Sequence, residues 1–388
     1  MKVRKIFVSL REITTRDAEM KSYPYVQINS ADALPEPEEN TGLVGHYAFQ
    51  YIDFTEPKAQ QYALNNTFVD CCFFGCELLP QQYRLLRDCL VLPRMGQPYH
   101  AFVPNLYNAS TLYEGFDVEN PITFKGCFDH RVYKEYRAQG EMCDDIRIML
   151  ARTLHDHSIY DELTNFLHSY DPQNVVGIMG GHGLRRADEG YRKIVRISKK
   201  LTEKGKLMIS GGGPGAMEAT HLGAWMAGRT TEELEDAFSI LQDFGQDETY
   251  LWVQSAFRVI DKYPQDRYKS LSIPTWFYGH EPSTPFATHI AKFFTNSVRE
   301  DMILSIAQGG ILVTPGSAGT LQEVFQNAAK LHYDEDGIVG PMIFLDTKFY
   351  TEEIPVYPFI KDLCDRGKYK QINLFLTDDP EEVYKIVK

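Results

Sequence analysis

The chain has 388 residues, enough for two domains or one large one, and 43% of them are hydrophobic and 24% charged. This composition is that of an ordinary folded protein and argues against a disordered chain. The net charge of -13 argues against a nucleic acid polymer or an anionic membrane as the main partner. A small anionic ligand remains compatible, because backbone N–H groups and one or two arginines can bind a phosphate inside an acidic protein.

The N-terminus and the cysteines bear on where the protein works. Charges interrupt the apolar residues of segment 1–17, which lacks the apolar core and the cleavage site of a signal peptide. No run of about 18 apolar residues occurs, so the sequence predicts no membrane span. Seven cysteines are too few and odd in number for a disulfide scaffold, and the cluster Cys71, Cys72 and Cys76 has no paired CxxC elsewhere and no nearby His. We therefore expect a cytoplasmic protein with buried free thiols and no metal site.

Residues 1–170 predict an additional N-terminal α+β region of unknown role. Segment 68–78 has a faint five-residue rhythm of bulky and small residues, as in a turn of a β-solenoid, but one or two turns are too few to predict one. Residues 144–170 form a strongly helical pattern that carries His155, His157 and His168. We interpret this pattern as a polar helix face that packs near the ligand domain rather than as a metal site.

From residue 171 to residue 388, apolar strands alternate with helical patterns, which predicts βαβ units and an α/β domain with a parallel sheet flanked by helices. Val175 to Met179 is the first predicted strand, and the next helix places Tyr191, Ile194, Val195, Ser198 and Leu201 on one face before Gly205 ends it. Further strands are predicted at 207–210, 250–257, 273–279, 309–316 and 340–346, the last being the final core strand. Further helices are predicted at 216–228, within 285–308 as one helix or two, at 320–333 and at 378–388.

A glycine-dense loop, "SGGGPGAMEA" at 210–219, lies between a predicted strand and a predicted helix. Its few side chains leave its N–H groups available to an anion, as in the shorter loop "GGHG" at 180–183. The loop lacks the Gly-Lys-Ser/Thr of a Walker motif and the acidic residue that a nicotinamide dinucleotide site places about 20 positions on. Glu218 lies in the first turn of the helix, where helix capping is the alternative to a role in a site.

A second loop, "VTPGSAGTLQE" at 313–323, follows the same logic. Small residues precede a helix N-terminus that offers Thr320 as a donor, and Glu323 follows three residues later. That spacing is also the spacing of a capping box, in which Thr and Glu satisfy each other's backbone groups. The functional interpretation is favoured because two such loops occur, each with a Glu in the first turn of its helix. In a parallel sheet both loops lie at the carboxyl ends of the strands, where ligands bind.

The stretches "GGGPGAMEA" and "PGSAGTLQE" resemble the paired signatures of the Lonely Guy family, whose second motif usually reads Pro-Gly-Gly-x-Gly-Thr-x-x-Glu. Together with "GGHG", they are similar to the larger nucleotide 5'-monophosphate nucleosidases of this superfamily. The resemblance covers about residues 174–350 and includes Arg299 in "SVRED". It implies a Rossmann-like nucleotide-binding fold and a phosphoribohydrolase that cleaves a nucleoside 5'-monophosphate to free base and ribose 5-phosphate without a cofactor. We reject the label lysine decarboxylase, often given to such proteins, because neither loop has a Lys for a Schiff base.

The resemblance and the chemistry of the loops together assign the expected site. Glu323, Arg299 and Glu218 are expected to be catalytic, the two carboxylates in acid/base and ribose-hydroxyl roles and the arginine as a charge clamp. Substrate and phosphate binding is expected from the loop residues Gly181, Gly211, Gly212, Gly213, Gly215, Met217, Pro315, Gly316, Ser317, Gly319 and Thr320. His280, Glu281 and His289 have two interpretations. They either lie near the pocket or serve local capping and packing, and the sequence favours the pocket no more than packing. Because relatives pair through the helices that flank these loops, we expect a homodimer or a larger homo-oligomer.

Ser317 departs from the family pattern, which usually has a glycine at that place. This departure and the large N-terminal region leave open an alternative, a nucleotide-binding sensor or regulatory protein without catalysis. The enzyme is favoured because a pure binder gains nothing from two carboxylates that face an anionic ligand and repel it.

Overall fold

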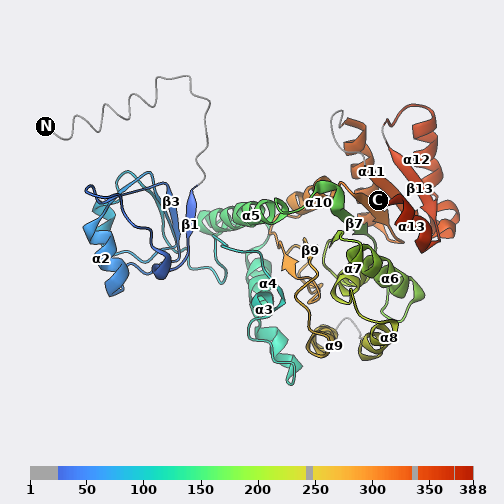
Figure 1. The fold of residues 1–388 in the computed structure, drawn as a ribbon, viewed down its shortest axis with the longest axis horizontal. Helices are drawn as coiled ribbons and strands as arrows, with labels where there is room; N and C mark the ends of the chain where they lie inside the picture. Colours follow the sequence, from blue (N-terminus) through green and yellow to red (C-terminus); the bar gives the residue numbers. More distant parts are fainter. Residues whose placement is uncertain (1–24, 242–247, 334–339, 371, 388) are drawn as a thin grey trace. The chain divides into compact units, whose positions relative to one another are not determined.

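The computed structural model describes residues 25–241, 248–333, 340–370 and 372–387 (Figure 1). Segment 1–17, on which the signal-peptide prediction rests, lies outside the described residues. The chain forms two compact units, Met1–Arg94 and Met95–Lys388. The sequence placed the boundary at 170/171, whereas the structure divides the chain at Arg94. The reason is that the helices between 95 and 170 bury side chains against the rest of the second unit, as in the ion pair of Asp129 with Lys292.

The first unit is a short coil of parallel strands. A four-stranded sheet has the order β1-β3-β5-β6, and a two-stranded sheet pairs β2 with β4. Every pairing between these strands is parallel, which requires the chain to travel in one direction around the coil. The elements are β1 (Val26–Ile28), β2 (Leu43–Gly45), β3 (Tyr47–Gln50), α2 (Pro57–Asn65), β4 (Thr67–Val69), β5 (Cys72–Phe74) and β6 (Leu90–Leu92).

The five-residue rhythm of the sequence marks the core of this coil. Phe68 and Phe73 lie five positions apart and are both buried, as are Cys71 and Cys76. The rings of Phe49 and Phe73 stack with their centroids 4.9 Å apart. The rhythm therefore corresponds to inward-facing side chains that repeat along a parallel coil, and the thiols are packing groups within it.

The second unit is a Rossmann-like α/β fold. Its sheet has seven parallel strands in the order β10-β9-β8-β7-β11-β12-β13 within the described residues. The chain runs outward from β7 to β10 and then returns to place β11 on the other side of β7. This reversal is a topological switch point, and in such folds ligands bind in the crevice beyond the carboxyl ends of the strands there. The strands are β7 (Val175–Met179), β8 (Leu207–Ser210), β9 (Ser270–Ser272), β10 (His289–Ile290), β11 (Gly310–Val313), β12 (Pro341–Leu345) and β13 (Asn373–Thr377).

Helices flank this sheet, and α6 and α7 lie side by side against it (Figure 1). The predicted apolar face of α6 is buried, and Gly205 follows the helix at a φ of +91°, a left-handed conformation that glycine adopts without strain. The helices are α3 (Ala109–Leu112), α4 (Phe128–Gln139), α5 (Ile146–Leu167), α6 (Glu189–Glu203), α7 (Ala216–Trp225), α8 (Thr231–Ile240), α9 (Thr249–Lys262), α10 (Asn296–Ile306), α11 (Ala318–Tyr333), α12 (Val356–Asp365) and α13 (Pro380–Ile386), with a π-helical turn η6 (Phe349–Glu353).

Four predicted elements differ in the structure. Segment 250–257 belongs to helix α9, in which Val253, Ala256 and Val259 are buried at helical spacing, although its aromatic and β-branched residues favoured a strand. Segment 273–279 follows β9 as irregular chain. Segment 285–308 contains the short strand β10 before the single helix α10. The strand at 340–346 is not the last one, since β13 pairs beside it.

Candidate functional site

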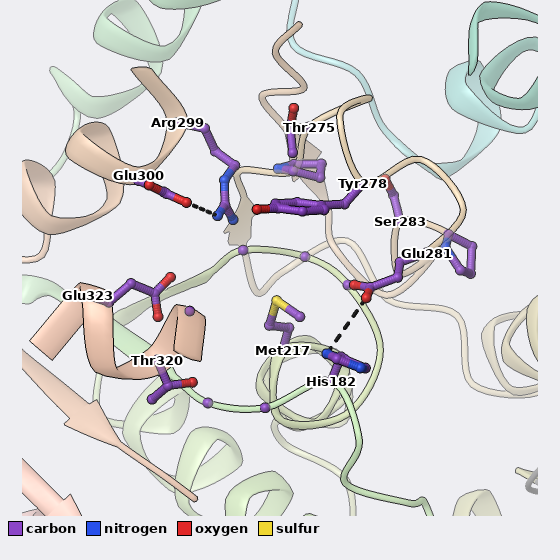
Figure 2. A pocket seen from close by; sticks show the side chains of 18 of the residues that line it. His182, Met217, Thr275, Tyr278, Glu281, Ser283, Arg299, Glu300, Thr320 and Glu323 are labelled. Carbon is purple, nitrogen blue, oxygen red and sulfur yellow. Dashed lines mark hydrogen bonds and ion pairs between the residues drawn. The ribbon is translucent and has the colours of Figure 1, made fainter. Parts of the chain in front are cut away.

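A cavity of about 350 Å³ lies at the carboxyl edge of the sheet, at the switch point. The loops after β7 and β8, the chain between β9 and β10, and the first turns of α10 and α11 form its walls (Figure 2). The cavity is lined by Gly180, Gly181, His182, Gly211, Gly212, Gly213, Met217, Pro274, Thr275, Tyr278, His280, Glu281, Pro282, Ser283, Arg299, Glu300, Ser317, Gly319, Thr320 and Glu323.

Backbone hydrogen bonds join the three glycine-bearing loops. The N–H of Gly181 donates to the carbonyl of Pro315 at 3.0 Å, and the N–H of Ala216 donates to the carbonyl of Gly181 at 3.2 Å. Gly181 therefore connects the loop after β8 with the loop after β11. The N–H groups at the start of each helix have no partner within their own helix, so a loop held this way presents preorganised donors to a ligand.

Two glycines are required by close approach. A Cβ on Gly316 would lie 2.1 Å from Oγ1 of Thr320, and a Cβ on Gly212 would lie 1.9 Å from Oγ of Ser272. Gly212 also has a φ of +75°, which disfavours other residues. At Gly319 the added Cβ would meet no atom of the described chain within 4 Å. Gly319, which also lines the cavity, is thus free of packing demands.

One face of helix α11 presents hydrogen-bond donors and acceptors to the cavity. The helix begins at Ala318, so Thr320 lies inside it and does not occupy the N-cap position that a capping box requires. Ser317, Thr320 and Glu323 all line the cavity, as their spacing of three residues on a helix allows. The capping alternative for Glu323 is therefore not realised, and its carboxyl faces the cavity (Figure 2).

The carboxyl of Glu323 has an altered acidity. Burial raises the pKa of Glu323 to about 7, Glu300 adds to the increase, and the positive charge of Arg299 opposes it. A carboxyl with a pKa near neutrality is half ionised at physiological pH and can exchange a proton with a bound reactant.

Arg299 and Glu300 approach Glu323 from α10. Both side chains are buried, and Nη2 of Arg299 lies 3.4 Å from Oε1 of Glu300. Glu300 is fixed by two amides, since Asn296 donates to Oε1 at 2.8 Å and Gln322 donates to Oε2 at 2.7 Å. Sequence reasoning missed Glu300, although it is the neighbour of a predicted arginine on the first turns of a helix.

Glu218 does not line the cavity, which corrects its predicted catalytic role. Its side chain is fully buried, turned away from the cavity around the axis of α7. There it accepts from Nε of Arg186 at 2.9 Å and from the hydroxyl of Tyr191 at 2.9 Å, and Ser255 accepts from the same guanidinium. The neighbouring Met217 is the residue of this turn that faces the cavity. Glu218 is thus one half of a buried ion pair within the core.

The wall opposite α11 comes from the chain between β9 and β10. Tyr278 places its ring over the cavity with its hydroxyl toward the Arg299 guanidinium (Figure 2). Behind this wall, the buried Nζ of Lys292 donates to Ser283 at 3.0 Å and to Asp129 at 2.6 Å. The same Asp129 oxygen accepts from the indole N–H of Trp276 at 2.8 Å. A helix from the 95–170 segment therefore holds this wall in place.

Most predicted site residues meet at the cavity, and a few serve it indirectly. Gly181, the three glycines 211–213, Met217, Ser317, Gly319, Thr320, Glu323 and Arg299 line it. Pro315, Gly316 and Gly215 lie outside the lining but shape the loops; a Cβ on Gly215 would lie 2.5 Å from the carbonyl oxygen of Gly181. His280 and Glu281 line the cavity, and Glu281 lies 3.6 Å from Nδ1 of His182. His289 instead packs against the ring of Phe166.

Among the described residues, no group of three His, Cys, Asp or Glu side chains is arranged to hold a metal ion. No helix in the described part of the chain is long and apolar enough to span a bilayer.

The fold and the cavity define a Rossmann-like α/β protein with a ligand-sized pocket at its switch point. No protein-family model matches the sequence, and no curated protein matches it. Solved structures similar to the chain include the molybdenum cofactor binding protein from the phototrophic bacterium Rippkaea orientalis, with 13% identity, a TM-score of 0.34, and coverage of 55% of this chain and 94% of that one. Another is the X-ray structure of TM1055, a structural genomics target, with 18% identity, a TM-score of 0.36, and coverage of 55% and 97%.

Proposed function

We propose that the protein hydrolyses the N-glycosidic bond of a nucleoside 5'-monophosphate to a free base and ribose 5-phosphate. The observation that carries the proposal is the carboxyl of Glu323, whose pKa is raised to about 7, beside Arg299 in a cavity lined by glycine loops. The resemblance of both loops to the Lonely Guy signatures supports the same reaction.

The phosphate is assigned to the N-terminus of α11. Ser317, Gly319 and Thr320 line the cavity there, and unpaired N–H groups at the start of a helix favour an anion through direct hydrogen bonds and the helix dipole. Arg299 supplies a full positive charge to the phosphate or to the departing base. Because Glu218 is buried elsewhere, Glu300 takes the role of acceptor for the ribose hydroxyls.

The chemistry is assigned to Glu323. As the C1'–N bond breaks, its electron pair leaves with the base and positive charge develops on the ribose. Ionised Glu323 stabilises this charge and accepts a proton from the water that adds to C1', and that proton later reaches the base. The ring of Tyr278, at the far side of the cavity from α11, offers a surface on which the flat base stacks.

The alternative function is a nucleotide sensor on the same scaffold. The observation in its favour is Ser317, which lines the cavity where the family motif usually has glycine. A hydroxyl at this place adds a donor to the phosphate site and narrows it, which changes affinity without requiring catalysis.

The test is to incubate the purified protein with AMP, GMP, IMP, CMP and UMP and to separate free base and ribose 5-phosphate by chromatography. We expect base release from at least one nucleotide, and none after Glu323→Gln. Tight binding of a nucleotide without any base release would refute hydrolysis and establish the sensor. Size-exclusion chromatography with light scattering on the same preparation tests the proposed homo-oligomer.

A further inference from the structure

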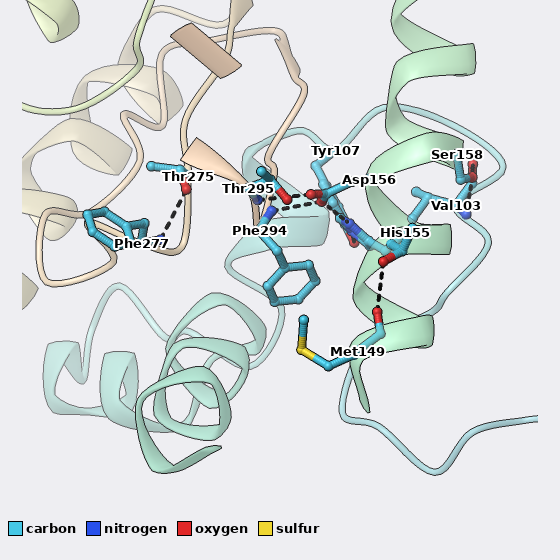
Figure 3. Close-up of polar contacts among 11 residues, drawn as sticks. Val103, Tyr107, Met149, His155, Asp156, Ser158, Thr275, Phe277, Phe294 and Thr295 are labelled. Carbon is cyan, nitrogen blue, oxygen red and sulfur yellow. Dashed lines mark hydrogen bonds and ion pairs between the residues drawn. The ribbon is translucent and has the colours of Figure 1, made fainter. Parts of the chain in front are cut away.

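The carboxylate of Asp156, on helix α5, lies outside the cavity but contacts the chain that leads into it. The side chain is buried, and its two oxygens accept from consecutive backbone N–H groups (Figure 3). Phe294 donates to Oδ1 at 2.7 Å, and Thr295 donates to Oδ2 at 2.9 Å. Asp156 is therefore bonded to the backbone through both oxygens, which fixes the position of that backbone and not only of a side chain.

These two N–H groups mark the beginning of α10. Thr295 is the N-cap residue of that helix, and its own side chain makes no capping hydrogen bond in the described structure. A carboxylate at a helix N-terminus satisfies N–H groups that lack partners and interacts favourably with the helix dipole. Asp156 thus anchors, from a distant part of the chain, the two backbone N–H groups that immediately precede α10.

The first turns of α10 deliver two of the charged groups of the cavity. The N–H of Arg299 donates to the carbonyl of Thr295, and Asn296 donates to Glu300 at 2.8 Å. The positions of Arg299 and Glu300 therefore depend on where α10 begins. Because Arg299 lowers the pKa of Glu323 and Glu300 raises it, a displaced helix start changes the electrostatics of the reacting carboxyl.

Neighbours hold Asp156 itself in place. Nδ1 of His155 lies 3.3 Å from Oδ1 of Asp156, and Nε2 of His155 lies 3.0 Å from the hydroxyl of Tyr107. The His155 ring also packs edge-on against Phe294, with the centroids 5.0 Å apart. The carboxylate is thus also contacted from the α5 side.

We propose that Asp156 is a positioning residue of the cavity, which acts through the start of α10 to set the placement of Arg299 and Glu300. The inference rests on the proposed function, since it assigns a role in that reaction. It also gives the 95–170 segment a role: this segment supplies a supporting layer for the site.

The test is a double-mutant cycle between Asp156→Asn and Arg299→Ala. The asparagine keeps the shape of the side chain but turns an NH2 group toward one of the two backbone N–H groups. We expect kcat per folded molecule to fall about tenfold to a hundredfold in the Asp156→Asn variant. In the Arg299→Ala background we expect the same substitution to lower kcat by a smaller factor than in wild type, because the part of its effect that passes through Arg299 is already lost. Equal losses in both backgrounds, or an unchanged kcat, would overturn the proposal.

Ser158→Ala is the matched control. Ser158 lies on the same helix and makes a similar pair of bonds, since it accepts from the N–H of Val103 at 2.7 Å and donates to its carbonyl at 2.9 Å (Figure 3). Its partner lies away from α10. We expect Ser158→Ala to lower the melting temperature without changing kcat, KM or the pH profile. A control that lowers kcat per folded molecule as much as Asp156→Asn would reduce Asp156 to a purely structural role and overturn the proposal.

Failure of the proposed function gives a different result. If the wild-type protein releases no base from any nucleotide, hydrolysis is refuted, and the positioning role is read from amide hydrogen exchange instead. Loss of protection confined to residues 294–300 in Asp156→Asn, and absent in Ser158→Ala, would support the anchor. Unchanged protection there would overturn it.

Discussion

Helices α7 and α11 begin alike in sequence and differ in where they place their carboxylates. Each follows a glycine-rich loop at the carboxyl end of a strand, and each carries a Glu near its start. Glu218 on α7 lies in the core, in a buried ion pair with Arg186. Glu323 on α11 faces the cavity, and its pKa is raised to about 7. A glycine loop and a following carboxylate therefore do not define a catalytic acid or base on their own.

The difference comes from the angular position of each side chain around its helix axis. On α7 the residue that faces the cavity is Met217, and the next position is turned by about 100°, away from the cavity. On α11 Thr320 faces the cavity, and Glu323 lies three residues later on the same face. Whether a carboxylate faces the cavity is thus better predicted by the residue three positions before it than by the glycine loop that precedes the helix.

The largest expected effect is on catalysis at Glu323. Glu323→Gln removes the proton acceptor and retains the size of the side chain, so we expect kcat for base release to fall by about 10²–10⁴. The measurement is steady-state kinetics on the nucleotide found active. Glu218→Gln is the paired variant, and its kcat per folded molecule should stay within about threefold of wild type. An equal loss in both variants would show that the two carboxylates are catalytically equivalent.

The second effect is on stability at Glu218. Glu218→Ala leaves the guanidinium of Arg186 buried without its carboxylate, so we expect the free energy of unfolding to fall by about 3–5 kcal/mol. Urea denaturation followed by fluorescence measures it. Glu235→Ala is the control, because Glu235 makes only solvent-exposed ion pairs with Arg192 and Arg196. It should cost less than about 1 kcal/mol. A similar loss in both variants would contradict the structural role of Glu218.

The third effect is on the pH dependence of stability. The pKa of Glu323 is raised in the folded chain to about 7 from an ordinary value of 4.5, so the folded state binds more protons than the unfolded state between these values. The contribution of Glu323 to stability is therefore present below about pH 4.5 and is lost as pH rises toward 7. We expect Glu323→Gln to be more stable than wild type at pH 8 and nearly equal to it at pH 4, as measured by urea denaturation. A constant difference at both pH values would rule out the raised pKa.

The fourth effect is on the pH profile of catalysis. Because the proposed role of Glu323 is that of an ionised base, we expect kcat/KM to rise with pH and to level off above about 7. Glu300 raises the pKa of Glu323, so Glu300→Gln should move this limb to lower pH. Arg299 lowers that pKa, so Arg299→Ala should move the limb to higher pH. Shifts in the opposite directions would contradict the assignment of the limb to Glu323.

The smallest effect compares two glycines of the α11 loop. Gly319→Ala meets no neighbouring atom of the described chain, so we expect unchanged stability and a KM raised about threefold to tenfold, because the methyl group enters the phosphate site. Gly316→Ala would place its Cβ 2.1 Å from Thr320 and should lower the melting temperature as well. A Gly319→Ala variant with a wild-type KM would place the phosphate elsewhere in the cavity.

The sequence predicted the parts of the fold that rest on local patterns. The apolar face of α6 and the strands that end at Met179, Ser210 and Val313 were confirmed, because each combines a clear apolar pattern with a glycine shortly after it. Helix α9 was mistaken for a strand, because its aromatic and β-branched residues suit both structures and burial decides between them. The strand β13 was missed, because a strand at the edge of the sheet with two of its five residues exposed has a weak pattern.

The site was predictable where backbone chemistry defines it and not where side-chain direction does. Glycine loops and a helix start identified Gly181, Ser317 and Thr320 without knowledge of the fold. The burial of Glu218 depends on Arg186, which lies 32 positions away in the chain and carries no local sign of that pairing. The hydrogen bond from the N–H of Phe294 to Asp156 joins residues 138 positions apart, and no periodic pattern or motif in the sequence predicts so distant a contact.

The two backbone hydrogen bonds that join the loops at Gly181 have a consequence for how the sequence of this protein can evolve. These bonds, to Pro315 and from Ala216, use only backbone atoms. Substitution of the surrounding side chains leaves both bonds available. Under the proposed function, base preference can therefore change through residues such as Tyr278 and Glu281 while the loops that would bind the phosphate keep their geometry. For the same reason, a mutational scan that replaces side chains will understate the importance of these two hydrogen bonds. Ala216→Pro, which removes the N–H that donates to Gly181, is a direct way to break one of them.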